Sequence, residues 1–236
     1  MKQKDLQTER NTEKKTFGEK FGDLLRKYRT VIIVVLAVIA AAVIAIAVIS
    51  QVRISQSAAS AKELEKANGD YSTWYSETDV TKKAAEEKTL SASLDQIIKK
   101  WPTQYAAARA LAMKAAIAQQ NKDWKSAEAD WELISTRFSK TYLAPIAIQN
   151  AAAAAEEAGN ADKSIELYNK LIKNFEGKTV GIPHAYFSLG RLSEGKKDYK
   201  AAMDNYTKVV TAYPQDDWTK LAQDRIIYLK AQGLAK

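Results

Sequence analysis

Side chains that could perform chemistry are scarce in this chain. It has one histidine, His184, and no cysteine. A typical zinc site needs further histidine or cysteine ligands, and a Ser-His-Asp arrangement would depend on this histidine alone. The lack of cysteine also excludes disulfides and a thiolate nucleophile. We therefore expect no metal site, and we place His184, which follows Pro183, at the start of a helix.

Carboxylates and glycines give no catalytic motif either. The pairs Glu86-Glu87 and Glu156-Glu157 lie in segments of helical composition, where charged neighbours are typical of a solvated face. The sequence has no G-x-x-x-x-G-K-[ST] phosphate loop, no G-x-G-x-x-G turn and no G-x-S-x-G elbow. We expect no catalytic residue, no cofactor and no enzyme activity.

The charge distribution argues against nucleic acid as a partner. The net charge is +8 over 236 residues. Residues 1–30 hold nine Lys/Arg and five Asp/Glu, and the remainder holds 27 against 23, so each part carries +4. The charges after residue 50 are interspersed, whereas nucleic-acid binding needs a concentrated basic face.

The most apolar stretch runs from Val31 to Ile49. Its nineteen residues are thirteen Val, Ile or Leu and six Ala. At about 1.5 Å per residue such a helix spans about 29 Å, close to the thickness of the hydrocarbon core of a bilayer. A buried helix of a soluble protein usually carries a polar stripe, which is absent here. We predict a transmembrane helix over residues 31–50.

Two short segments precede this stretch. Residues 1–16 have one large apolar side chain, Leu6, and are expected to form a disordered cytoplasmic tail. Residues 17–30 are expected to form a basic amphipathic juxtamembrane helix in the headgroup region. Its apolar side chains recur at helical spacing: Phe17, Phe21, Leu24, Leu25 and Tyr28.

The basic residues before the stretch also predict its orientation. Nine Lys/Arg precede it, whereas only Arg53 and Lys62 occur in the fifteen residues after residue 50, so the N-terminus is expected in the cytoplasm. A cleaved signal peptide ending near Ala59-Ser60-Ala61 is the alternative, although the apolar region is long for one. Ala37, Ala41 and Ala45 form a small-residue strip that could support a homodimer through the span.

From residue 51 the pattern is helical and repetitive. Large apolar residues recur with a period of 37 to 38: Leu94, Trp131, Tyr168 and Tyr206 form one column. We predict a connecting helix with a degenerate first repeat over 51–104, three repeats over 105–216 and a capping helix over 217–236. Asn68-Gly69-Asp70 is expected to break the connecting helix, and the turn at Gly159-Asn160 is expected to be one residue shorter than its equivalents. Since one helical hairpin cannot bury its apolar face alone, the units must stack.

These columns resemble the tetratricopeptide repeat (TPR) family. Residues 183–216 fit best: Tyr186, Leu189 and Gly190 match the large-aliphatic-small positions of the first helix, and Ala202 and Tyr206 match the second. Two earlier units keep parts of the pattern, starting near Ala108 and Pro145. The resemblance implies a TPR-like α-solenoid of helical hairpins. Together with the predicted single N-terminal transmembrane helix, this makes the expected fold all-α.

The resemblance also implies protein binding in a groove lined by the first helices. Phe187, between His184 and Arg191, would suit an apolar partner residue flanked by acidic groups or a carboxylate. The candidate groove residues are Arg109, Gln149, Asn150, His184, Phe187, Arg191 and Arg225.

The arrangement of tail, span and repeats resembles a narrower group, the ancillary subunit of the bacterial SecYEG translocon and its relatives. This resemblance implies a scaffold or chaperone-like protein of the bacterial inner membrane, with its repeats in the periplasm and translocon subunits or exported chains as partners. A structural adaptor in envelope assembly or cell division is the alternative, and an envelope enzyme is the least favoured hypothesis. Anchoring in a eukaryotic organelle membrane is the alternative location.

Overall fold

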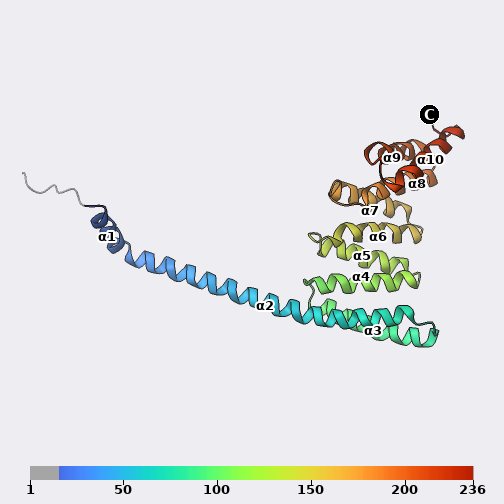
Figure 1. Ribbon diagram of the computed structural model, residues 1–236. Coiled ribbons are helices and arrows are strands. Elements are labelled where there is room, and N and C mark those ends of the chain that lie inside the picture. Colours follow the sequence, from blue (N-terminus) through green and yellow to red (C-terminus); the bar gives the residue numbers. More distant parts are fainter. Residues whose placement is uncertain (1–15, 236) are drawn as a thin grey trace, which may run out of the picture. The chain divides into compact units, whose positions relative to one another are not determined.

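The computed structural model describes residues 16–235 and contains ten helices and no strand in that range (Figure 1). The described residues divide into two compact units, residues 16–55 and 56–235. The predicted disordered tail falls outside the described residues except for Thr16. The helices are α1 (Phe17–Lys27), α2 (Arg29–Ser76), α3 (Val80–Lys100), α4 (Tyr105–Gln120), α5 (Trp124–Arg137), α6 (Leu143–Glu157), α7 (Ala161–Phe175), α8 (Ile182–Gly195), α9 (Tyr199–Ala212) and α10 (Asp217–Ala231).

The first unit consists of α1 and the apolar part of α2. Thr16 and Glu19 form a capping box that fixes the start of α1. Tyr28 separates the two helices, although its N–H donates to the carbonyl of Leu24 and its own carbonyl accepts from Ile32. The most apolar window of α2 has a mean hydropathy of 3.5 and none of it is buried, so the helix is long and apolar enough to cross a membrane.

Helix α2 does not break at Asn68-Gly69-Asp70, which corrects the sequence prediction. It continues to Ser76, and the Thr73 hydroxyl donates to the carbonyl of Gly69 over 3.2 Å. Glycine in a helix costs only about 1 kcal/mol relative to alanine. Ala67 and Trp74, on either side of the step, are fully buried in the second unit, and their packing outweighs that cost.

In the second unit, residues 56–76 of α2 and the whole of α3 form the first helical hairpin. One apolar cluster joins Ala67 and Trp74 of α2 to Leu90, Leu94 and Ile97 of α3. The same cluster continues into α4. The degenerate first repeat is thus a hairpin whose first helix is the end of α2.

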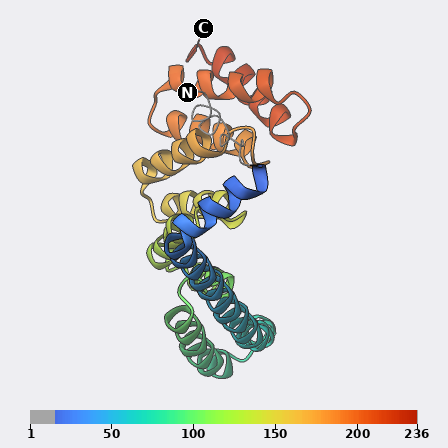
Figure 2. The ribbon, with the colours of Figure 1, turned by 90° about the vertical axis from the view of Figure 1, so that its left-hand side faces the viewer.

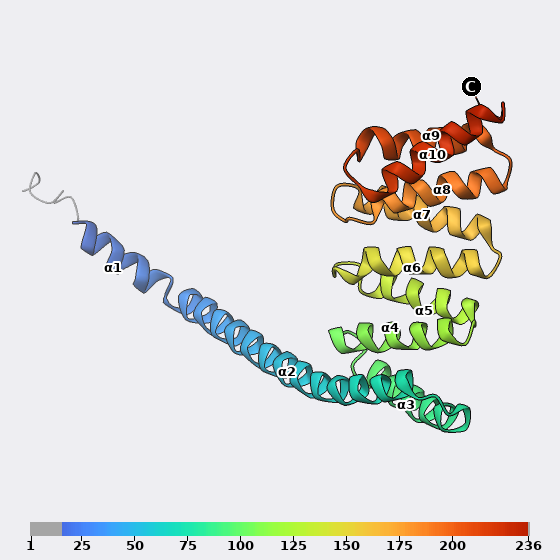
Figure 3. The same ribbon diagram turned by 45° about the vertical axis from the view of Figure 1, so that its right-hand side comes forward.

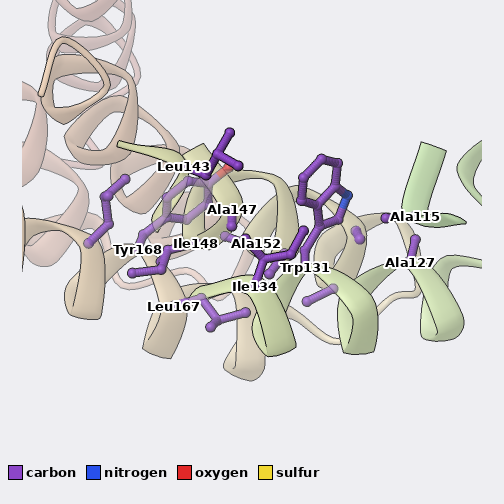
Figure 4. Close-up of a cluster of buried hydrophobic side chains, with 14 of the residues drawn as sticks. Ala115, Ala127, Trp131, Ile134, Leu143, Ala147, Ile148, Ala152, Leu167 and Tyr168 are labelled. Atoms are coloured by element: carbon purple, nitrogen blue, oxygen red, sulfur yellow. The ribbon is translucent and has the colours of Figure 1, made fainter. Parts of the chain in front are cut away.

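Three further hairpins, α4–α5, α6–α7 and α8–α9, stack on the first in chain order, as Figure 3 shows. Figure 2 shows the same layers from another side. A continuous apolar cluster runs from α4 to α8, and Figure 4 shows its central part. The predicted column of Leu94, Trp131, Tyr168 and Tyr206 is buried throughout. A Cβ added at Gly190 would lie 2.5 Å from the Tyr206 ring, so only glycine fits there. The predicted all-α fold of TPR-like hairpins is confirmed.

The turns inside the three hairpins share one geometry, which corrects the expectation of a shorter turn at Gly159. The residue before each second helix's N-cap has a positive φ: Lys122 (59°), Gly159 (78°) and Lys197 (61°). The N-cap N–H then bonds back to the first helix, to Ala118, Ala155 or Ser193, over 2.8 to 2.9 Å. This is a Schellman ending, and glycine and lysine occupy the same left-handed position.

Helix α10 packs on α9 and α8 through Thr219, Ala222 and Leu229, which are buried. Lys220, Gln223 and Asp224 are exposed. The last helix therefore covers the stack and turns polar side chains to solvent, as a capping helix of a solenoid does.

Candidate protein-binding surface

The first helices α6, α8 and α10 present a set of side chains, most of which contact one another from helix to helix. Leu221 and Tyr228, which are exposed on α10, complete the set. We name this set the α6–α8–α10 face. Its members are Gln149, Glu156, His184, Phe187, Arg191, Glu194, Trp218, Leu221, Arg225 and Tyr228.

His184 lies at the centre of this face and links three helices. Its Nδ1 is 3.1 Å from Nε2 of Gln149 on α6, and its ring centroid is 4.5 Å from that of Trp218 on α10. Burial lowers the pKa of His184, and the positive charge of Arg191 lowers it further, while Glu156 opposes both. The neutral imidazole therefore acts as a packed spacer between helices. Among residues 16–235, no group of three potential ligands could hold a metal ion.

Both arginines of the face are engaged in ion pairs between successive first helices. Arg191 donates two hydrogen bonds to Glu156 of α6, and Arg225 donates two to Glu194 of α8. Paired N–H groups on one carboxylate are a strong, directional form of ion pair. These pairs tie α6 to α8 and α8 to α10 at nearly the same place in the repeat.

The second of these pairs extends into the core. The Tyr206 hydroxyl donates to Glu194 over 2.6 Å, so one carboxylate accepts from two side chains. Burial would raise the pKa of Glu194, but the hydrogen bonds from Arg225 and Tyr206 outweigh it and the pKa is lowered. Glu194 therefore stays ionised and neutralises Arg225.

Apolar side chains occupy the space between these pairs. Phe187 is half-buried, with its ring centroid 5.0 Å from that of Trp218 and 5.5 Å from that of Tyr206. On α10, Leu221 follows Trp218 by three residues and Tyr228 follows Arg225 by three, so each is a helix-surface neighbour of a member of the face. Leu221 is 47% exposed and Tyr228 is 46% exposed. These two residues are seven apart, so they lie on the same side of the helix. The face thus offers an apolar strip whose neighbouring charges are internally balanced.

The structure brings five of the seven predicted residues together: Gln149, His184, Phe187, Arg191 and Arg225. Arg109 lies apart on α4, beside the exposed ring pair of Tyr105 and Tyr142, whose centroids are 6.1 Å apart. Asn150 follows Gln149 on α6 and is half-buried.

Sequence analysis did not identify several members of the face: Glu156, Glu194, Trp218, Leu221 and Tyr228. Glu156 was interpreted as part of a solvated pair. One signal was available, because Glu156 and Arg191 are 35 residues apart and Glu194 and Arg225 are 31 apart, both somewhat shorter than the repeat period of 37 to 38. Opposite charges at that spacing indicate a bond between neighbouring repeats.

Comparison with known proteins agrees with this architecture. Residues 147–177 and 184–216 match the tetratricopeptide repeat family. These stretches cover most of α6–α7 and of α8–α9, the hairpins that carry most of the face. These two stretches are therefore similar to TPR repeats, and repeats of that family serve in protein–protein interaction.

A relative from Treponema pallidum (strain Nichols), described as a "TPR repeat-containing protein", is 28% identical over 150 residues. The alignment covers 63% of this chain and 62% of the relative, so the chain spans less than two thirds of that protein's length.

Proposed function

We propose that this chain is a single-pass membrane protein whose repeats bind other proteins through the α6–α8–α10 face, as a scaffold or chaperone-like module. The observation that carries the proposal is the apolar strip formed by Phe187, Leu221 and Tyr228. Exposed apolar side chains that cluster on one face of a soluble unit mark an interaction site.

The chemistry of the face also specifies the partner segment. Since Arg191 and Arg225 are each satisfied by a glutamate, recruiting either for a partner's carboxylate would leave that glutamate unpaired, which is costly. The best-matched partner is therefore the apolar side of an amphipathic helix or an extended apolar peptide. An acidic segment, considered at first for Phe187, is less well matched.

Two features support the placement in a membrane. The stretch from Val31 to Ile49 has no polar side chain, and the basic residues precede it. By the positive-inside rule the N-terminus lies in the cytoplasm and the repeats lie outside it, in the periplasm of a bacterium with two membranes. Partners at the secretion translocon fit this location. An adaptor role in envelope assembly or division is the second candidate, favoured if the span itself makes the specific contacts.

The binding proposal is tested by a matched pair of substitutions on α10. Leu221→Asp places a charge in the apolar strip. Ile227→Asp is the control, because it places the same charge outside the strip. The Ile227 side chain is 65% exposed but points about 120° around the helix from Leu221. A photo-crosslinking residue at position 187 of the full-length protein in its own membrane, followed by mass spectrometry, identifies what the face contacts. We expect Leu221→Asp to abolish most crosslinks and Ile227→Asp to leave them unchanged. Equal crosslinking in both variants would refute the proposed face.

The identity of the captured proteins separates the finer alternatives. Translocon subunits together with newly exported chains would support a role in secretion. A fixed set of assembly or division proteins, lost when residues 31–50 are replaced by an unrelated span, would favour the adaptor. Orientation is tested separately with an exposed Ser139→Cys variant, since the chain has no other cysteine. Labelling by an impermeant maleimide in intact spheroplasts is expected, whereas labelling only after lysis would contradict the orientation.

A further inference from the structure

We infer that α1 is a second membrane contact, which lies along the headgroup layer of an anionic lipid leaflet. This inference relies on the proposed span in α2. It concerns the other side of the membrane from the repeats and has no connection with the α6–α8–α10 face.

The apolar side chains of α1 gather on one side. They are four residues of α1 and Tyr28, which follows it. At about 100° per residue along a helix, these five side chains fall within an arc of about 100° around the helix axis. All five are exposed: Phe17 86%, Phe21 53%, Leu24 51%, Leu25 41% and Tyr28 43%. No residue of α1 is buried. Five large apolar side chains on three helical turns make a face that requires an apolar environment.

The charges of α1 are placed for a negatively charged surface. Lys20 and Lys27 are seven residues apart and line the same border of the apolar face, where a long side chain can reach from the acyl boundary to a phosphate. Lys27 already lies over the Tyr28 ring, 5.4 Å from its centroid. From residue 17 to residue 29 there are four Lys/Arg and two Asp/Glu, so the segment carries +2.

One of the two acidic residues has a structural role. Glu19 accepts from the Thr16 N–H over 2.8 Å within the capping box. The carboxylate is thereby held at the N-terminus of the helix, near the positive end of the helix dipole. The basic residues Arg26, Lys27 and Arg29 are at the opposite end, next to the start of α2.

Continuity with α2 identifies the occupant of this face. Val31, the first residue of the apolar stretch, follows Arg29 by two residues. If α2 enters the bilayer there, the C-terminal end of α1 lies at headgroup depth, where an amphipathic helix with a basic border is stable. The anionic lipids of a cytoplasmic leaflet attract basic segments next to a span. A second copy of the chain would match the apolar side chains but would bring two basic borders together.

The absence of cysteine makes a direct test possible. Single cysteines at Leu24 and at Arg26 place an environment-sensitive fluorophore on the apolar side of α1 and, two residues on, nearly opposite. A third, Ile39→Cys, reports on α2. Each full-length variant is reconstituted into vesicles of phosphatidylcholine alone or of equal parts phosphatidylcholine and phosphatidylglycerol. Quenching by aqueous iodide then measures exposure of each label.

In anionic vesicles we expect the label at position 24 to be protected several-fold better than the label at position 26, with loss of that protection in neutral vesicles or at high salt. Substituting both Lys20→Gln and Lys27→Gln in the position-24 variant should lower the docked-to-free ratio of α1 roughly 25-fold, about fivefold per lysine. The label at position 39 should be protected in both kinds of vesicle.

The possible failures are distinguishable. Equal quenching at positions 24 and 26 with protection at 39 would overturn the inference and leave the span standing. Quenching at position 39 would overturn the span and this inference with it. If the label at position 24 is protected equally in neutral and anionic vesicles, and equally with and without the two lysine substitutions, the proposal of an anionic lipid partner would be wrong. Protection that increases with the number of protein molecules per vesicle would show that a second copy covers α1.

Discussion

Helix α2 has two parts with different distributions of apolar side chains, residues 31–49 and residues 56–76. From Val31 to Ile49, α2 is apolar on every side, and every residue except Ile32 is exposed. Between residues 56 and 76 the same helix is mostly polar. Its buried or half-buried positions, apart from Asp70, follow a spacing of three and four: Ser60, Leu64, Ala67, Tyr71 and Trp74.

The two patterns differ because their surroundings differ. A stripe with a period of 3.5 residues matches one packed neighbour along one side, as in a coiled coil, and α3 supplies Leu90, Leu94 and Ile97 for it. An all-round apolar surface has no preferred side and suits a surrounding apolar solvent. A helix therefore records its environment in the angular distribution of its apolar side chains, not in their number alone.

The largest expected effect is on the striped part. Trp74→Ala should lower the free energy of unfolding of the repeats by about 3 to 5 kcal/mol, because it empties a fully buried site between α2 and α3. Urea unfolding of the detergent-solubilised protein, followed by far-ultraviolet circular dichroism, measures it. Ser72→Ala, at an exposed position of the same turn, should change it by less than about 0.5 kcal/mol. Equal effects would mean that α2 is not part of the repeat core.

An arginine placed in the apolar part of α2, and another placed in its striped part, test whether only the apolar part lies in a membrane. Ile39→Arg should disfavour membrane insertion by about 3 to 4 kcal/mol, since arginine is unfavourable at the centre of a span and a favourable isoleucine is lost. Ala61→Arg puts the same charge at an exposed position of the striped part and should leave insertion unchanged. The fraction of protein that resists carbonate extraction from membranes reports both. Undiminished resistance for Ile39→Arg would contradict a span in residues 31–50.

Close packing is the property that the repeats have and an exposed apolar helix lacks. Gly190→Ala should destabilise the repeats by about 1 to 3 kcal/mol, because its methyl group would collide with the Tyr206 ring. Gly195→Ala, at the end of the same helix with nothing within 4 Å, should be neutral or slightly stabilising. Thermal unfolding of the two variants gives the difference. Similar melting temperatures would show that the α8–α9 contact is looser than the structure indicates.

Much of the fold was predictable because the repeat imposes periodic restraints. The columns through Trp131 and Tyr206 recur every 37 to 38 residues, and any sequence that stacks hairpins must bury such columns. The face was less predictable. His184 and Arg191 were predicted from the sequence as groove residues and the structure brings them together, yet whether an arginine is free or paired depends on side-chain geometry between repeats. The ion pair between Arg191 and Glu156 joins residues 35 positions apart, and the spacing of these two charges is the only sign of it in the sequence.

The errors came from local rules that tertiary packing overrides. The positive φ of Lys197, a residue that seldom adopts it, is enforced by the hairpin that closes around it. Asn68-Gly69-Asp70 contains residues common in turns, and the expected break follows from their propensities alone. Local propensity determines the secondary structure only where tertiary packing does not. In α2 the turns on either side of residues 68–70 are held in helical form by the packing of Ala67 and Trp74.

The same reasoning predicts the smallest effect. Gly69→Ala should stabilise the repeats by about 0.5 to 1 kcal/mol, since nothing lies within 4 Å of the added methyl group and alanine loses less entropy in a helix. The melting temperature should rise by a few degrees. If instead Gly69 were the turn expected from sequence, alanine would oppose it and the melting temperature would fall. The sign of this small change therefore decides whether α2 passes unbroken from the apolar stretch into the repeats.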